Sequence, residues 1–348
     1  MEYVLRCLSC QKQHSSKYES QICKCGGILE VIYKERFPRV DGNLFWDYET
    51  FLPKGKYRYY QLGNTHLLKG HLEGNLFLKM ELENPTKSFK DRGSVIEVAK
   101  ANEYGYDEVV CASTGNMAYS ITYYSKLFGL KSKVFISRDA NKDKIDNIMK
   151  LGNADVVKVD GDFTLAQKHA IAYSNKNESF LTGDYCYRKE GQKTIAYEII
   201  SQLPNVKYII IPVGNATLLS GMYKALRQLY DSKCIRIMPK LIGVESTSCM
   251  PLVKAFRSKS PIEYEMPNTK ADAIAVGYPT FGDQALLGIK DTDGSVIGVT
   301  DRDLEKQQKE FLKEYGIVSE LAGVASIACF KKLKPRGDSV AIISGGNV

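Results

Sequence analysis

The segment NPTKSFKDRG at residues 84–93 joins a strand-like stretch at 75–81 to a helical pattern at 91–105. Asp91 stands where an acidic side chain favours the start of a helix. Lys90 directly precedes it, and a lysine amine can form an imine with an aldehyde cofactor and later move a proton at a substrate carbon. On spacing alone a lysine near a helix start is usually a solvated charge, so the rest of the sequence decides which role Lys90 has.

Short β-branched runs alternate with amphipathic helical patterns from about residue 75 onward. This alternation predicts βαβ units and mainly parallel sheets, and 348 residues are enough for two lobes. In such sheets ligands bind beyond the carboxyl ends of the strands, where a loop leads into a helix. The expected strands lie at 75–81, 107–113, 132–137, 154–160, 208–214, 240–246, 294–300 and 339–344, and the expected helices at 91–105, 116–129, 142–152, 163–175, 190–203, 218–230 and 303–316.

Three polar loops follow expected strands. Ser113, Thr114, Gly115 and Asn116 offer hydroxyls and backbone N–H groups at a helix start, which suits an anion such as a carboxylate, although the same residue types also form ordinary helix caps. The segment PVGNAT at 212–217 can cradle a phosphate with backbone donors. The segment SGGN at 344–347 follows the last strand, and by itself it is consistent with an ordinary glycine-rich turn.

The first 33 residues contain two tight cysteine pairs, followed by the strand-like stretch at 28–33. Cys7, Cys10, Cys23 and Cys25 have the paired spacing that aims four thiolates at one tetrahedral zinc ion. The second pair is tighter than the usual spacing, so a ribbon that folds without metal stays an alternative. His14 lies between the pairs, where it is either a substitute ligand or a solvated side chain.

Composition and charge favour a cytoplasmic enzyme over a membrane or nucleic-acid-binding protein. The 48 basic and 40 acidic residues are scattered along the chain, and no basic stripe interleaved with aromatic residues is present. No apolar run is long enough to cross a bilayer, and the N-terminal residues lack the pattern of a secretory signal. The five cysteines outside the pairs are expected to be reduced thiols.

The lysine segment closely resembles the motif of fold-type II pyridoxal-phosphate enzymes, and within them that of threonine synthases. The resemblance extends over most of the chain, and it implies a two-lobed α/β fold like that of the tryptophan synthase β chain, with parallel sheets and a small N-terminal zinc ribbon. It also implies that Lys90 carries pyridoxal 5'-phosphate as a Schiff base. Lys87 stands where the family commonly has glycine, and is expected to add positive charge near the substrate.

The resemblance also assigns roles to the loops. It gives Asn116 a contact with the phenolic oxygen of the cofactor, and it assigns Ser344 to the pyridine nitrogen. The segment around Glu320 is similar to the family's Glu-Pro-Ala-Gly-Ala-Ala stretch, with Leu321 in place of proline. The substrate carboxylate is assigned to Ser113, Thr114 and Gly115, and the cofactor phosphate to Gly214, Asn215, Ala216 and Thr217.

Two neighbouring segments bear on the substrate. The stretch YRKEGQKT at 187–194 is similar to a threonine-synthase segment whose arginine is associated with the substrate phosphate, a role that falls on Arg188. Residues 183–186 differ from the family's Asn-Ser-x-Asn-Pro, and SGGN resembles the serine and threonine dehydratases more than the threonine synthases. The resemblance therefore supports the cofactor more firmly than the amino-acid substrate.

We expect three parts: a zinc ribbon at 1–33, a first lobe at 60–185 with the lysine and the carboxylate loop, and a second lobe at 186–348 with the phosphate loop. The resemblance implies a homodimeric threonine synthase that converts O-phosphohomoserine and water to threonine and phosphate. The alternatives are a serine or threonine dehydratase, or a β-replacement enzyme similar to cysteate synthase. A zinc-ribbon binding protein without catalysis is a third possibility, and it leaves the lysine motif unexplained.

Overall fold

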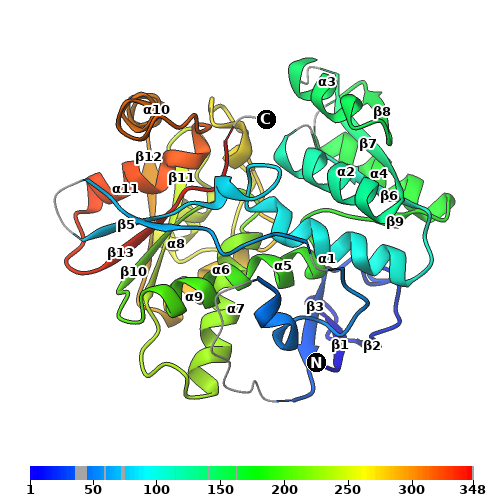
Figure 1. Ribbon diagram of the computed structural model, residues 1–348, viewed down its shortest axis with the longest axis horizontal. Helices are drawn as coiled ribbons and strands as arrows, with labels where there is room; N and C mark the ends of the chain where they lie inside the picture. Colours follow the sequence, from blue (N-terminus) through cyan, green and yellow to red (C-terminus); the bar gives the residue numbers. More distant parts are fainter. Residues whose placement is uncertain are drawn as a thin grey trace.

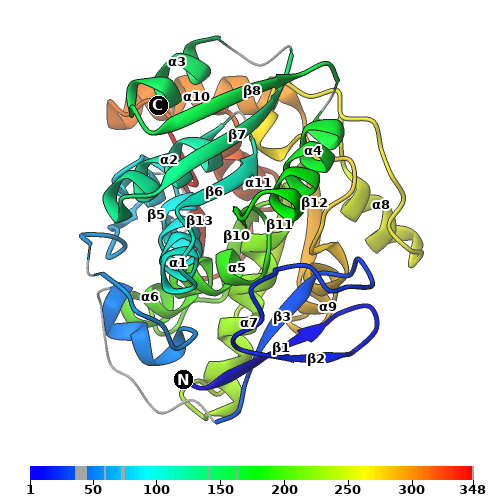
Figure 2. The ribbon, with the colours of Figure 1, turned by 90° about the vertical axis from the view of Figure 1, so that its right-hand side faces the viewer.

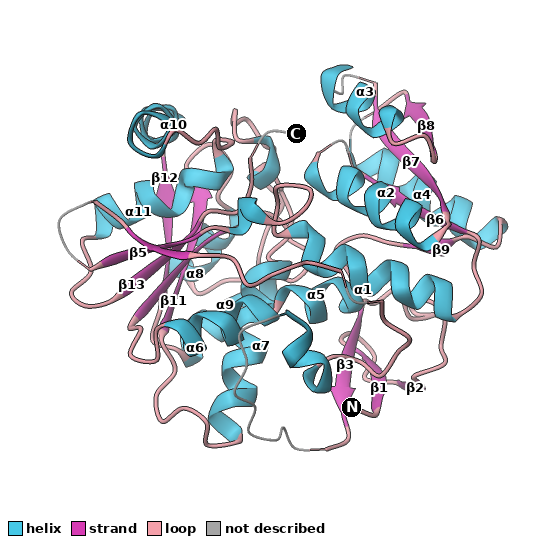
Figure 3. Ribbon diagram, viewed as in Figure 1, coloured by secondary structure: helices cyan, strands magenta, loops and turns pink. Residues whose placement is uncertain are grey.

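The computed structural model describes residues 1–35, 45–58, 60–71, 75–113, 115–138, 142–161 and 163–346. They form two α/β lobes and a small N-terminal sheet (Figure 1). The three sheets are separate in space, with the helices of each lobe packed around its own sheet (Figure 3). In this part of the chain, no helix has the length and apolar character needed to cross a membrane.

The larger lobe is built on a six-stranded sheet in the order β12-β11-β10-β13-β5-β4. All neighbouring strands are parallel except β4 and β5. Ile209 and Ile211 of β10 pack with one group of helices, and Ile210 packs with another, because successive side chains point to opposite faces of the sheet. The strands are β4 (Leu67–Lys69), β5 (Leu76–Lys79), β10 (Tyr208–Pro212), β11 (Lys240–Ser246), β12 (Ser295–Val299) and β13 (Ser339–Ile342).

Helices cover both faces of this sheet, which explains why the middle of its central strands is apolar on both faces. One face packs against α6 (Thr194–Gln202), α7 (Thr217–Asp231), α8 (Pro251–Ser258) and α9 (Gly282–Asp291), and the other against α10 (Asp301–Tyr315) and α11 (Ala325–Leu333). Short 3-10 helices lie at η1 (Phe45–Phe51), η2 (Glu81–Glu83), η3 (Asp272–Ile274) and η4 (Ala322–Val324).

The smaller lobe has a four-stranded parallel sheet in the order β8-β7-β6-β9. Its strands are β6 (Glu108–Ala112), β7 (Lys131–Ser137), β8 (Ala154–Val159) and β9 (Phe180–Leu181). Its helices are α2 (Asn116–Phe128), α3 (Lys142–Lys150) and α4 (Phe163–Lys176). Two more helices, α1 (Lys90–Glu103) and α5 (Cys186–Gln192), lie side by side between the lobes (Figures 1 and 2).

The contact between α1 and α5 is close because glycines meet there. A Cβ atom on Gly191 would lie 1.8 Å from the carbonyl oxygen of Arg92, and one on Gly93 would lie 2.5 Å from Cγ of Arg188. No side chain fits at either position without moving the helices apart. This close approach holds the start of α1 against α5, the helix that leads into the larger lobe.

The N-terminal sheet is antiparallel in the order β2-β1-β3, with β1 (Tyr3–Cys7), β2 (Gln13–Ser15) and β3 (Leu29–Tyr33). It lies against α5 and α7 (Figure 2). Glu30 of β3 accepts a bond of 2.6 Å from Lys189 of α5 and forms an ion pair with Lys224 of α7. The ribbon is therefore joined to both helices by buried charges.

Every expected strand is present, and its bounds lie within two residues of the prediction. The helix expected at 190–203 is two helices, α5 and α6, which meet at Lys193. Strands β1, β2, β4 and β9 and helices α8, α9 and α11 were not predicted, because most are short or lack a clear periodic pattern.

The structure corrects the predicted first lobe at 60–185. Strands β4 and β5 lie inside that range, yet β5 pairs with β13 of the larger lobe, where Leu76 is opposite Ser339. The chain therefore enters the larger sheet first and changes lobes only at the segment 84–93. Pairing between strands far apart in sequence decides this arrangement, and no local pattern reports it.

Candidate functional site

A cavity of about 220 Å³ lies between the lobes, at the carboxyl ends of strands from both sheets. Loops after β6, β10 and β13 and the start of α1 all reach it, as expected for parallel α/β sheets. Most of the residues that the sequence singled out are thus brought together. The predicted residues that line the cavity are Lys90, Ser113, Gly115, Asn116, Gly214, Asn215, Ala216, Thr217 and Ser344.

Lys90 is the first residue of α1, and its side chain points into this cavity. Its Nζ atom lies 3.9 Å from Oδ1 of Asp184 and 4.8 Å from the ring centre of Phe89. Burial lowers the pKa of the Lys90 amine, and the Asp184 carboxylate opposes that shift. A buried lysine with a lowered pKa is more readily a neutral nucleophile than a solvated lysine.

The loop before α1 is held in place by hydrogen bonds to both lobes. Asp91 accepts bonds of 2.7 Å from the Thr86 backbone N–H and 2.6 Å from the Ser120 hydroxyl. The Phe89 backbone N–H donates to the carbonyl of Ser344 at 3.0 Å. The lysine loop is therefore fixed both to the smaller lobe and to the end of the last strand.

The segment Gly214–Thr217 precedes α7, a helix of 15 residues whose N-terminus faces the cavity. Ala216 has a φ of 61°, and a Cβ atom on Gly214 would lie 2.8 Å from the carbonyl oxygen of Ala273. Such a tight turn at a helix N-terminus exposes backbone donors to an anion. The geometry fits the phosphate of the expected cofactor.

Asp184 was not predicted as a site residue, yet it joins Lys90 to this turn. Its carboxylate accepts bonds from Nδ2 of Asn215 at 2.8 Å and from the Thr217 hydroxyl at 2.7 Å. Burial favours its neutral form, but Lys90 and Arg188 hold the pKa of Asp184 below its usual value. The departure of residues 183–186 from the family pattern was the sequence signal for this position.

Asn116 and Glu320 meet on another wall of the cavity. Nδ2 of Asn116 donates to Oε1 of Glu320 at 2.8 Å, and Glu320 is only 9% exposed. Burial raises the pKa of the Glu320 carboxyl to about 7, and nearby Asp272 adds to the shift. The acidic position suggested by the resemblance therefore belongs to the cavity.

Arg188 is not among the residues that line the cavity, so its expected contact with a substrate phosphate stays a prediction. Its side chain is fully buried, and Nη2 donates to Glu97 Oε2 at 2.6 Å and to the Ser94 hydroxyl at 3.1 Å. Nε donates to the Gly183 carbonyl at 2.8 Å, and Nη1 donates to the Lys90 carbonyl at 3.2 Å. These four bonds use four of the five N–H groups of the guanidinium and hold it between α1 and the segment before α5.

Lys87 is also absent from the cavity lining, because its side chain is exposed to solvent. Its φ of 56° lies in the left-handed region, which explains why glycine is common at this position in the family. Thr114 lies outside the described residues. Lys144 of α3 does line the cavity, where it pairs with Asp272 of η3 from the opposite lobe.

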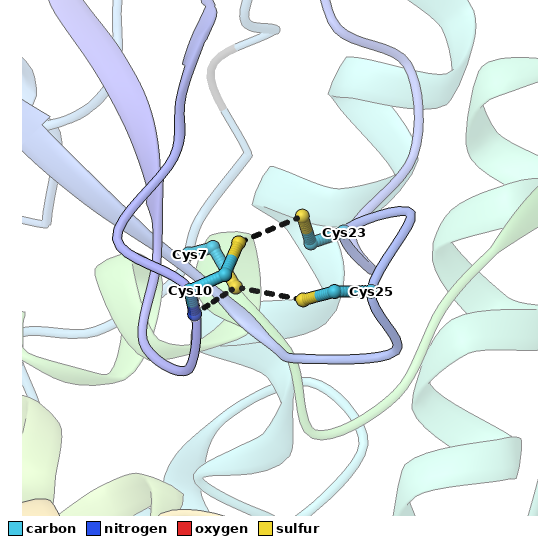
Figure 4. Close-up of side chains that lie close together, drawn as sticks. All are labelled: Cys7, Cys10, Cys23 and Cys25. Carbon is cyan, nitrogen blue, oxygen red and sulfur yellow. Dashed lines mark hydrogen bonds between the residues drawn. The ribbon is translucent and has the colours of Figure 1, made fainter.

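The four ribbon cysteines converge as the sequence predicted (Figure 4). Their sulfur atoms all lie within 4.8 Å of one another, which suits four thiolates around one ion. Cys7 and Cys23 are buried, whereas Cys10 and Cys25 are exposed. His14 lies at the edge of the group, with Nε2 3.4 Å from the Cys23 sulfur.

Comparison with known proteins agrees with this geometry. A family model described as pyridoxal-phosphate dependent enzyme matches residues 59–345. The threonine synthase of Methanocaldococcus jannaschii is 34% identical, with coverage of 95% of this chain and 88% of the relative, and that of Methanosarcina acetivorans is 32% identical, with 99% and 92%. The structure of processed threonine deaminase isoform 2 from Solanum lycopersicum superposes with a TM-score of 0.70 and 25% identity, over 82% of this chain and 84% of that one.

The substitution Glu320→Gln tests the burial of the Glu320 carboxyl. Folding raises its pKa from 4.5 to about 7, so the folded state binds this proton more tightly than the unfolded state does. This contribution to stability is complete below about pH 4.5 and is lost as the pH rises through about 7. We expect the parent protein to lose about 2–4 kcal/mol more stability than the variant between about pH 4.5 and pH 8.

Urea unfolding of the cofactor-free proteins at the two pH values measures this difference. The glutamine side chain still accepts the bond from Asn116, so packing changes little. An equal pH dependence in parent and variant would show that Glu320 titrates normally.

Proposed function

The chain belongs to the pyridoxal-phosphate-dependent enzymes and, within them, to the threonine synthase family, and from this premise we propose that it converts O-phosphohomoserine and water to threonine and phosphate. The observation that supports this most strongly is the convergence of Lys90, Asn116, the turn at 214–217 and Ser344 on one cavity. These residues come from distant parts of the chain and line the same cavity, which supports the proposal.

The residues present fit pyridoxal 5'-phosphate. When bound, this cofactor acts as an electron sink for negative charge at the α-carbon of the substrate. We assign its covalent attachment to the Lys90 amine and its phosphate to the turn Gly214–Thr217. Asn116 would contact the ring oxygen of the bound cofactor, and the Ser344 hydroxyl would face its ring nitrogen. A hydroxyl partner would leave the ring a weaker electron sink than a carboxylate partner would.

Lys90 also carries the proton transfers of the proposed reaction. Once the substrate amine has replaced Lys90 on the cofactor, the freed Lys90 amine would accept the proton from the substrate α-carbon and help to move a β-proton to the γ-carbon. Phosphate would leave the γ-carbon, and water would add at the β-carbon. The carboxylate of Asp184 supports this role because it stabilises the protonated amine from 3.9 Å away. Ser113, Thr114 and Gly115 are assigned to the substrate carboxylate, at the start of α2.

Arg188 does not line the cavity, so a cation that does is the better candidate for the substrate phosphate. Among the described residues that line the cavity, the basic side chains are Lys90 and Lys144. Because Lys90 is committed to the cofactor, we assign the substrate phosphate to Lys144. Lys144 and Asp272 lie on opposite walls of the cavity and form an ion pair with each other. A phosphate that enters the cavity therefore competes with the Asp272 carboxylate for the Lys144 ammonium group.

A second candidate is a serine or threonine dehydratase, and two observations favour it. Arg188 is occupied by Glu97, and the carboxylate of Asp184 gives the cavity negative charge that a phosphorylated substrate must tolerate. The threonine deaminase similarity shows that the same fold serves a protein of that name. A β-replacement enzyme similar to cysteate synthase belongs to the same group of alternatives.

Turnover of a substrate panel distinguishes these functions. We expect phosphate release from O-phosphohomoserine, and little keto acid from serine or threonine. Lys144→Ala should lower kcat/KM for O-phosphohomoserine by a factor equivalent to about 1.5–3 kcal/mol of transition-state stabilisation, since it removes a bond to a charged group. Lys142→Ala is the matched control, because Lys142 lies on the same helix and is not part of the cavity lining.

Ketoacid release from serine or threonine without any phosphate release would favour the dehydratase. Equal kinetics of the Lys144 and Lys142 variants would show that Lys144 does not bind the substrate phosphate.

We assign one structural zinc ion to Cys7, Cys10, Cys23 and Cys25, supported by their mutual distances of at most 4.8 Å. Four thiolates leave zinc no open position for a substrate, so its role is structural. Cys10→Ser should remove the metal and lower the melting temperature, whereas Cys234→Ser should keep it, since Cys234 lies outside this group. Metal analysis of protein expressed with ample zinc checks both, and a metal-free parent would show that packing alone holds the ribbon.

We further propose that the enzyme acts in the cytoplasm as a homodimer on a small amino-acid substrate, without nucleic-acid or membrane partners. The scattered basic residues support the lack of a nucleic-acid partner. The dimer rests on family resemblance.

A further inference from the structure

A buried chain of hydrogen bonds runs from the metal-binding ribbon toward the cavity. It begins at Gln21, which is two residues before Cys23 and only 1% exposed. Its Nε2 donates to Glu97 Oε1 at 3.2 Å and to the Leu181 carbonyl at 2.7 Å, and its Oε1 accepts from the Tyr187 backbone N–H at 3.3 Å. One ribbon side chain therefore bonds to α1, β9 and α5 at once.

Glu97 of α1 carries the chain further. Its Oε1 accepts from the Gly183 backbone N–H at 2.9 Å, and its Oε2 accepts from Arg188 at 2.6 Å. Arg188 in turn donates to the carbonyls of Gly183 and Lys90. Both backbone segments that place the Lys90–Asp184 pair are therefore bonded to this chain.

We infer that Gln21 is a positioning residue, through which the N-terminal ribbon sets the geometry of Lys90 and Asp184 by way of Glu97 and Arg188. A glutamine suits this place because it donates and accepts at the same time without carrying charge. The buried carboxylate and guanidinium keep their positions only while their hydrogen bonds are complete. The ribbon thus contributes to the site although none of its residues lines the cavity.

The charged groups in this chain of hydrogen bonds make it sensitive to the loss of any one of its side chains. Burial raises the pKa of Glu97 to about 7, while Arg188, the Gly183 N–H and Gln21 oppose the shift. Without Gln21 the carboxyl is neutralised more easily, and a neutral Glu97 holds Arg188 less tightly. Arg188 then moves relative to the two carbonyls that it bonds, and the Lys90–Asp184 distance changes with them.

The inference rests on the proposed role of Lys90 as the cofactor lysine, and its test uses the full-length holoenzyme. Gln21→Ala should raise the dissociation constant of pyridoxal phosphate about tenfold, equivalent to about 1.4 kcal/mol. It should also change the visible circular dichroism of the lysine-linked cofactor, which reports how the ring is held. Gln13→Ala, an identical substitution at an exposed ribbon position, should leave both unchanged.

Glu97→Gln provides a second test if Gln21→Ala does not fold. It keeps the size of the side chain and removes its charge, and we expect the same change in cofactor affinity and dichroism. Folded variants at both positions that bind the cofactor and show the dichroism of the parent would overturn the inference. A parent protein that takes up no pyridoxal phosphate would instead refute the proposed role of Lys90.

Discussion

Buried ion pairs around α1 are the constraint on which the position of the site depends. Arg92 pairs with Glu81 at 2.7 Å and with Glu198 at 2.6 Å, and Lys79 pairs with the same Glu198 at 2.7 Å. All four side chains are fully buried, and breaking such a pair leaves a charge in the interior at a cost of about 3–5 kcal/mol. This network joins β5, α1 and α6, so the start of α1 cannot move independently of the larger lobe.

The cavity is formed where three helices begin. Lys90, Asn116 and Thr217 are the first residues of α1, α2 and α7, and all three line it. Helix N-termini carry partial positive charge and unpaired N–H groups, which favours the carboxylate and phosphate groups of an amino-acid substrate and its cofactor. The carboxyl groups of Asp184 and Glu320 line the same cavity. The cavity therefore has both positive and acidic groups, unlike a site that binds only anions.

The sequence predicted the features that depend on local patterns. The alternation of apolar runs and amphipathic stretches located every expected strand, and the cysteine spacing predicted the cysteine group. The family resemblance pointed to Lys90 and to the loops that line the cavity. It did not predict that β5 joins the C-terminal sheet, because strand pairing is a long-range property. It did not predict that Arg188 pairs with Glu97, because a motif shows which residue is present but not which side chain 91 positions earlier contacts it. The same reason hid Asp184, whose importance arises only when Lys90 and the phosphate turn approach it.

The central claim is that Lys90 holds pyridoxal phosphate covalently in the cavity between the lobes. Borohydride reduction of the loaded protein, followed by protease digestion and mass spectrometry, tests it most directly, because reduction makes the lysine link permanent. We expect the added pyridoxyl phosphate mass on the peptide that contains Lys90, and no labelling in Lys90→Ala. A label on a different lysine, or none on a folded and cofactor-saturated protein, would contradict the claim.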